Sequence, residues 1–126
     1  MSDSKDLIEL PKNVVATLAL EVWRLWRTLE KPEMQTIGVR LRYSIRKMKD
    51  SLEAHGCTFI DATGKVYDAG MAVDIIDTEG KKTSDESERI VKEMIVPTIV
   101  FNDVLLKHGQ VILEWKTKIE NPVKGA

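Results

Sequence analysis

The sequence predicts an α+β fold in which a helical hairpin precedes a small antiparallel β domain. Two observations carry this prediction. In residues 12–54 apolar side chains recur at helical spacing, whereas in residues 57–116 they alternate or run together as strands do. Between them, residues 51–76 contain turn sequences at Gly56, at 61–64 and at 68–70. This stretch is therefore the predicted joint between a helical half and a β half.

The first helix is predicted over Lys12–Glu30, and Pro32 then interrupts the pattern. Its apolar residues are spaced three and four apart, which is typical of a heptad seam, and Trp26 widens the stripe. A second helix is predicted from Glu33 or Met34 to Ala54, with Gly38 inside it. His55 and Gly56 are expected to end that helix, because glycine readily takes the left-handed conformation.

The connection between the helices is short, so they should pack antiparallel as a hairpin. Two helices of this length cannot bury both wide stripes against each other alone. We therefore expect two copies to form a homodimer whose hairpins build a four-helix bundle. The alternative is that the hairpin lies on the β half of its own chain. The predicted dimerisation residues are Val15, Leu18, Val22, Leu25, Trp26, Leu29, Ile37, Leu41, Ile45 and Met48.

The β half is expected to contain short strands joined by tight turns. Asn102-Asp103 is a good hairpin-turn pair, whereas residues 77–88 have no apolar member and should form an exposed, mobile loop. The predicted domains are a flexible N-terminus (1–10), the hairpin and dimerisation module (11–55), the β domain (56–116) and a flexible tail (117–126). The predicted strands are Cys57–Asp61, Lys65–Tyr67, Met71–Ile76, Arg89–Val96, Thr98–Phe101, Val104–Leu106 and Gln110–Lys116.

Composition excludes several classes of protein. The formal net charge of the 126-residue chain is −1, so no global charge attracts nucleic acid or a membrane surface. Cys57 is the single cysteine, which excludes an intramolecular disulfide and fits a reducing compartment. No signal peptide and no apolar run long enough to span a bilayer is evident. We expect a soluble, cytoplasmic protein that does not associate with membranes.

The sequence points to no reaction. His55 and His108 have no motif that pairs them as metal ligands. Asp61, Asp68 and Asp74 lie in or beside turns, where aspartate commonly stabilises turn geometry. No nucleophile elbow and no phosphate-binding glycine loop is present. We therefore expect a protein-interaction module that is not an enzyme and uses no cofactor or metal.

A basic run on the second helix could contact phosphates, which would favour nucleic-acid binding. The simpler interpretation is the solvated face of that helix, since Leu41, Ile45 and Met48 supply its buried face. We do not expect nucleic acid as the partner. The run consists of Arg40, Arg42, Arg46, Lys47 and Lys49.

Two stretches resemble the C-terminal part of GrpE, the nucleotide exchange factor of DnaK-type chaperones. Residues 52–60 (LEAHGCTFI), followed by Gly64 and Tyr67-Asp68, are similar to the family's leucine-ended helix, glycine, short strand and glycine before Phe-Asp-Pro. Residues 102–112 (NDVLLKHGQVI) resemble its closing hairpin. A helical hairpin before a compact β domain is also the family's order of parts. The resemblance covers about residues 12–116.

The chain departs from the family at three places. Ala69 stands where the family has the proline of Phe-Asp-Pro, and Ala72-Val73-Asp74 replaces His-Glu-Ala. The long N-terminal coiled-coil helix is missing, so the roles of that stalk in substrate reach and thermal sensing should be absent.

The resemblance implies a homodimeric co-chaperone that promotes ADP release from a DnaK-type chaperone. Its β domain would bind the open form of the nucleotide-binding domain more tightly than the closed form. A scaffold or adaptor that has lost exchange activity is the alternative. The implied partner-binding residues are Tyr67, Asp68, Gly70, Met71, Pro97, Asn102 and Asp103.

Overall fold

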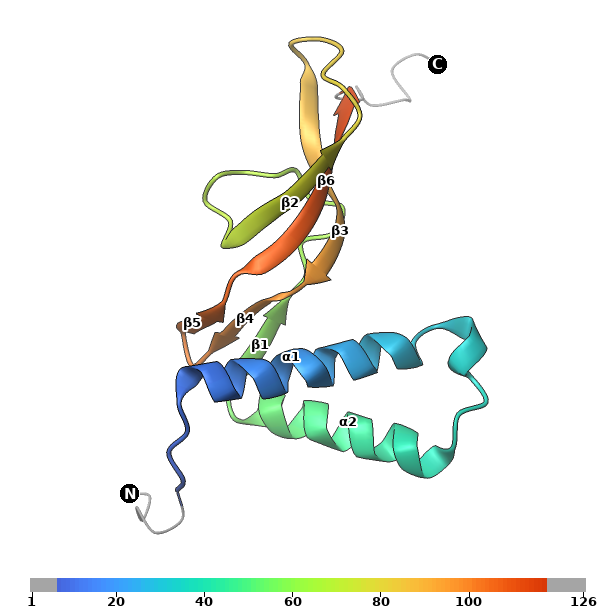
Figure 1. Ribbon diagram of the computed structural model, residues 1–126, viewed down its shortest axis with the longest axis vertical. Helices are drawn as coiled ribbons and strands as arrows, with labels where there is room; N and C mark the ends of the chain where they lie inside the picture. The colour runs from blue at the N-terminus through green and yellow to red at the C-terminus, as the bar shows by residue number, and fades with distance from the viewer. Residues whose placement is uncertain (1–6, 118–126) are drawn as a thin grey trace. The chain divides into compact units, whose positions relative to one another are not determined.

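The computed structural model describes residues 7–117, which form two compact units (Figure 1). The first unit joins residues 7–59 to the later segment Ile99–Leu106, and the second joins Ile60–Thr98 to residues 107–117. The α+β class is confirmed, but the β half of the sequence is divided between the two units. The predicted flexible ends fall largely on residues 1–6 and 118–126, which lie outside the described residues.

The first unit contains the predicted helical hairpin. Helix α1 spans Lys12–Leu29, within one residue of the prediction, and packs antiparallel beside helix α2, Val39–Ala54 (Figure 1). At the end of α2, His55 is the C-cap and Gly56 takes φ 103°, as predicted. The backbone N–H groups of His55 and Gly56 donate to the carbonyls of Leu52 and Glu53, which closes the last turn.

The predicted start of the second helix is wrong. Pro32–Met34 form a short 3-10 helix, η2, and Gly38 is the N-cap of α2 with φ −56° and ψ 145°. Met34 and Ile37 therefore belong to the connection, where Arg42 Nη2 donates to the Met34 carbonyl at 2.8 Å. The apolar spacing continues across this connection, but Gly38 is a poor helix former and the helix begins only after it.

Three short strands complete the first unit, in the order β1-β4-β5. Asn102 and Asp103 both take positive φ, 48° and 66°, which is the geometry of a tight two-residue hairpin turn and confirms the predicted turn. The hairpin thus shares a compact unit with part of the β half, which was the alternative arrangement considered above. The strands are β1 (Cys57–Ile60), β4 (Thr98–Phe101) and β5 (Val104–Lys107).

The second unit is built on a three-stranded sheet of order β2-β6-β3 (Figure 1). Strand β6 pairs antiparallel with β3 but parallel with β2, so the prediction of a purely antiparallel β domain is wrong for this sheet. A parallel pair needs a long connection, and here the chain passes through β3, β4 and β5 between β2 and β6. The strands are β2 (Val73–Glu79), β3 (Ser87–Val96) and β6 (Gly109–Thr117).

Two smaller predictions for this unit also need correction. Residues 65–67 form no strand, and Val66 makes only an isolated bridge with Ile90. The predicted loop 77–88 is shorter, because β2 continues to Glu79 and β3 begins at Ser87. The predicted alternation along β6 is confirmed. Val111 and Leu113 are fully buried and form the core with Ala62, Val91 and Met94.

Candidate functional site

The structure divides the predicted dimerisation residues into two groups. Val22, Leu29 and Ile45 are buried within a single copy, and Val15, Trp26 and Ile37 are half-buried. The second group faces solvent. Its members are Leu18 (53% exposed), Leu25 (44%), Leu41 (49%) and Met48 (42%). The hairpin therefore uses part of its stripe for its own unit and leaves the rest without a partner in one copy.

Three of these side chains, Leu18, Leu25 and Met48, lie at two adjoining depressions of the first unit, whereas Leu41 lines neither. One, of about 680 Å³, lies between the helices and includes Leu25 and Met48. The other, of about 540 Å³, lies between the start of α1 and the β4–β5 hairpin and includes Phe101. Both include Leu18 and Leu52, so the two depressions form one continuous surface, which we call the apolar groove.

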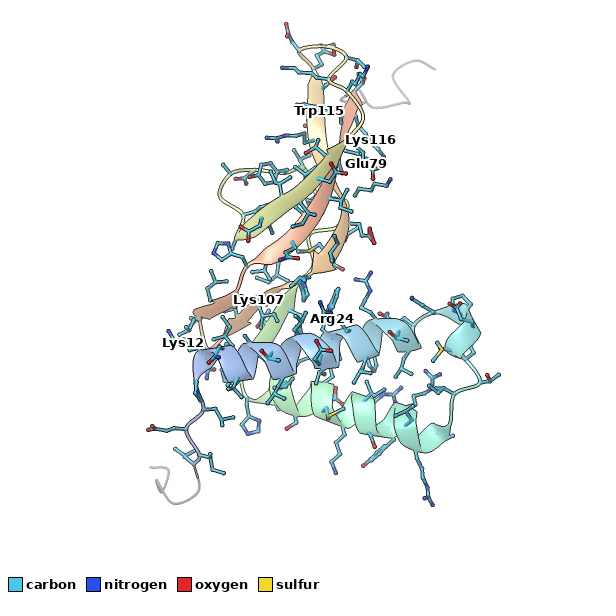
Figure 2. All side chains as sticks on the ribbon, viewed as in Figure 1. Lys12, Arg24, Glu79, Lys107, Trp115 and Lys116 are labelled. Carbon is cyan, nitrogen blue, oxygen red and sulfur yellow. The ribbon has the colours of Figure 1, made fainter. Side chains whose placement is uncertain are left out.

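The rim of the helical part of the groove carries charges of both signs. Glu21 borders it on α1 and Lys47 on α2. Glu21 is held by Arg24, whose Nη1 lies 2.7 Å from its carboxylate, and both side chains are half exposed or more. Figure 2 labels Arg24 on α1. A surface with an apolar floor and a mixed rim suits protein association better than phosphate binding.

The structure does not place the predicted partner-binding residues in one unit. Residues 67–71 lie in the second unit, and Asn102 and Asp103 form the exposed β4–β5 turn of the first. Tyr67 and Met71 pack against the core of the second unit, and Pro97 is fully buried. The exposed members of the predicted set are Asp68, Gly70, Asn102 and Asp103.

A small cavity of about 230 Å³ adjoins the loop that contains Met71. Met71, Val73 and Ile60 line it with apolar groups, and Lys65 supplies a cation. The buried Thr98 hydroxyl, also in the lining, donates to the Ala72 carbonyl at 2.9 Å and so fixes the wall. The cavity has the size of one side chain and could accept one from a partner.

Sequence reasoning missed a stack of side chains on the second unit. The Arg89 guanidinium lies 4.9 Å from the ring centre of Tyr67 and 5.5 Å from that of Trp115. Arg89 and Trp115 are direct partners in the β3–β6 register. The alternation that predicted Leu113 as core also places Trp115 on that face, but the register is not visible in the sequence. Figure 2 labels Trp115 near the end of β6.

The candidate polar residues have local structural partners. The Asp61 carboxylate accepts from the Thr63 N–H at 2.9 Å and from the Thr63 hydroxyl at 2.6 Å. Asp68 accepts from the Gly70 N–H in the same way. These are the turn geometries expected of aspartate. Among residues 7–117, no group of three or more His, Cys, Asp or Glu side chains is arranged to hold a metal ion.

The two histidines have different local partners. His55 Nδ1 lies 2.8 Å from the Ser51 carbonyl and therefore helps close the end of α2. His108 Nδ1 lies 3.8 Å from an Asp74 carboxylate oxygen, and both side chains are more than half exposed. Cys57 is buried, and burial together with the nearby Glu53 carboxylate raises the pKa of its thiol. A thiol with a raised pKa is a poor nucleophile.

The basic run on α2 is not one free surface. Arg42 is engaged with the Met34 carbonyl, and Lys49 pairs with Glu53 at 3.1 Å. Lys49 also lies 5.0 Å from the Trp26 ring centre, and Lys47 lies 5.8 Å from that of Tyr43. Several of these cations therefore stabilise the hairpin itself.

Two comparisons complete the description of the chain. No protein-family model matches the sequence, and no curated protein matches it either. None of the helices within residues 7–117 combines the length and the apolar character required to cross a bilayer.

Proposed function

We propose that this chain is a GrpE-like co-chaperone that acts in the cytoplasm as a homodimer and promotes ADP release from a DnaK-type chaperone. The observation that carries the proposal is the placement of the two stretches that resemble the family. Leu52 lies in the last turn of α2, Gly56 in the left-handed stop, and Asn102-Asp103 in a tight turn before Val104. These helix-end and turn geometries support the proposal, because the resemblance implies a helix end and a hairpin turn at these positions.

Homodimerisation is supported by the apolar groove. Hydrophobic burial favours covering Leu18, Leu25, Leu41 and Met48, which are 42–53% exposed in one copy. A groove that meets the same groove of a second copy around a two-fold axis would bury both at once. In this arrangement two hairpins form a four-helix bundle.

Exchange by such a protein requires no chemistry of its own. The exposed Asp103 and Asp68 regions would contact the nucleotide-binding domain of the chaperone, and the cavity beside Met71 would accept one of its side chains. Binding accelerates ADP release if the open form of that domain is bound more tightly than the closed form. A shift from 1% to 99% open would need about a 10⁴-fold difference in affinity.

The direct test is ADP release from a DnaK-type chaperone of the same cell, measured with a fluorescent ADP analogue. The expected result is release that becomes faster with increasing concentration of this protein. Unchanged release, together with no complex in sedimentation velocity, would contradict the proposal.

A matched pair of variants tests the contact surface. In Asp103→Gly the carboxylate is removed, while glycine keeps the positive φ of the turn. We expect weaker chaperone binding, by about 3- to 10-fold for the loss of one charged contact, with no loss of thermal stability. Asp85→Gly removes an exposed carboxylate from the loop before β3 and should leave binding unchanged. Equal effects of the two variants would exclude a specific contact at Asp103.

An adaptor without exchange activity is the second candidate, and one observation favours it. Tyr67, Met71 and Pro97 are drawn into the fold of the second unit, which leaves fewer side chains for a chaperone. Ala69 and residues 72–74 also depart from the family. A pull-down from cell extract separates the two candidates, because an adaptor would recover another protein and no DnaK-type chaperone.

A further inference from the structure

The segment that precedes α1 exposes apolar side chains in an extended conformation. Residues 7–11 form neither helix nor strand. Leu7, Ile8 and Leu10 are 62%, 87% and 53% exposed. Glu9, between them, has no ion-pair partner within residues 7–117. An extended strip with three large apolar groups around one carboxylate is costly to leave in water.

The groove next to this segment has the complementary character. Its floor is formed by Leu18, Leu52, Phe101, Val104 and Leu106. Among the described residues that line the depression of about 540 Å³ in this groove, Lys12 alone carries a charge. Figure 2 shows Lys12 at the first turn of α1.

The start of α1 adds to the positive charge of Lys12. No acidic residue lies in the first turn of this helix, and no side chain caps it. The amino end of a helix carries a partial positive charge and favours a carboxylate. The segment before α1 and this end of the groove are therefore matched in both apolar character and charge.

The segment does not fill the groove of its own copy. Ile8 and Leu10 border the depression of about 540 Å³, yet both remain more than half exposed. The space beside them is open to a further chain. In a two-fold dimer, each copy offers one such segment and one such groove to the other.

We propose that residues 7–11 of each copy insert into the apolar groove of a second copy, with Ile8 and Leu10 on its floor and Glu9 on the opposite side of the extended segment. Glu9 then faces Lys12 and the amino end of α1 of the other copy. This inference rests on the homodimer of the proposed function and extends its interface from the helices to the β4–β5 hairpin. Continuity supports it, because Leu18 and Leu52 belong to both parts of the groove.

A second copy is a better occupant than an unrelated protein, because this chain itself supplies both the groove and a segment that matches the groove in apolar character and charge. A standard interface buries about 800 Å² of each partner. The helical part of the groove presents only a few large side chains, and the exchanged segment adds Ile8 and Leu10 to the buried area.

Charge reversal with mixing tests the exchange. In Glu9→Lys, two lysines face each other at each contact, and in Lys12→Glu two glutamates do. Each variant alone should dimerise about 5- to 20-fold more weakly than wild type, since two contacts become repulsive. In a one-to-one mixture, the heterodimer carries an opposite-charge pair at both contacts and should regain affinity within about twofold of wild type.

The mixture also excludes a contact within one copy. Glu9 and Lys12 of the same chain still carry like charges in either variant, so mixing cannot relieve a repulsion between them. Native mass spectrometry with one variant labelled with ¹⁵N measures the heterodimer fraction, and sedimentation equilibrium measures the dissociation constants. A statistical fraction of heterodimer would overturn the inference.

A variant that removes two apolar side chains of the segment tests the exchange independently of charge. Ile8→Ser with Leu10→Ser should weaken the dimer by 10-fold or more while leaving the melting temperature of the dilute monomer unchanged, because both side chains are exposed there. A wild-type dimer that tolerates these changes would contradict the exchange and leave the homodimer intact. A wild-type chain that stays monomeric would contradict both.

Discussion

Gly56 ends helix α2 with a backbone conformation that other residues rarely adopt, and it does so beside a distant part of the chain. Its φ is 103°, and its carbonyl accepts the Asn102 N–H at 3.0 Å. A Cβ at this position would collide with the Asn102 side-chain oxygen. Gly56 therefore serves two needs, a left-handed stop for the helix and close approach of the β4–β5 turn.

Replacement of Gly56 tests both needs. Gly56→Ala should lower the free energy of unfolding by about 1–3 kcal/mol for the strained φ alone, and further because Asn102 must move. Gly64→Ala is the matched control, since Gly64 has φ 87° and no atom within 4 Å of an added Cβ. Urea unfolding of both variants measures the difference. An equal loss in the two would show that the approach of Asn102 adds nothing.

Cys57 gives a prediction about pH. Burial, assisted by Glu53, raises the pKa of its thiol in the folded state, whereas a thiol in the unfolded chain ionises near about 8.5. Below that pH both states are protonated and the contribution to stability is complete. As the pH rises above that value, the unfolded state loses its proton first, so the stability of wild type should fall relative to Cys57→Ala. Parallel pH profiles of the two proteins would contradict this.

At the scale of elements, the local sequence pattern predicted whether a segment is a helix or a strand. It predicted less accurately the residue at which that helix or strand begins. Periodicity located α1 and the alternation of β6 because both depend on neighbouring residues. It extended α2 too far, because Met34 and Ile37 continue the apolar spacing although Pro32 and Gly38 interrupt the helical backbone. The pattern of side chains and the conformation of the backbone thus give different answers in this connection.

A substitution at Gly38, the N-cap of α2, should increase the stability of the protein. Gly38 takes extended angles that any residue adopts, has no atom within 4 Å of an added Cβ, and makes no side-chain cap. Gly38→Ser should stabilise the protein by about 0.5–1 kcal/mol, since serine caps the helix and reduces the freedom of the unfolded chain. Thermal unfolding measures the gain, with Gly38→Ala as the variant that lacks the cap. Equal stability of the two would exclude a contribution from capping.

Strand pairing shows the limit of local reasoning more clearly. The tight turns of the β half favoured antiparallel neighbours, and the β4–β5 hairpin follows that rule. The parallel pairing of β2 with β6 joins Val73 to Gly109 and depends on the whole chain between them. The stack of Tyr67, Arg89 and Trp115 depends on the register of β3 with β6, so no spacing in the sequence could indicate it.

At the scale of the whole molecule, the exposed side of the hairpin gives a direct test of dimerisation. Leu25 is 44% exposed at the groove, so a charge there is tolerated in one copy and buried in a dimer. Leu25→Glu should weaken dimerisation on the order of 100-fold, because it buries an unpaired charge. Thr28→Glu adds the same charge at an exposed position of α1 that does not line the groove. Light scattering over a dilution series distinguishes the two, and a similar mass for both would exclude the groove as the interface.

The candidate surfaces were predictable from the sequence to different degrees. The width of the apolar stripe indicated that some of it would stay uncovered, but which residues do so depends on how β1, β4 and β5 share the first unit. The partner-binding residues came from resemblance alone, and burial of Pro97 depends on the packing of both neighbouring strands. The chaperone partner and the dimer stay predictions.

The division of the chain between the units has a consequence for synthesis on the ribosome. The first unit needs Ile99–Leu106 in addition to residues 7–59, so its helices are made well before the strands that complete it. Chains emerge at about 5–20 residues per second, and early segments wait for later partners. During this interval the nascent hairpin exposes both the helical part of its groove and the face that later contacts β4 and β5. The order of translation thus makes this small protein a candidate client for the cell's own chaperones while it is being synthesised.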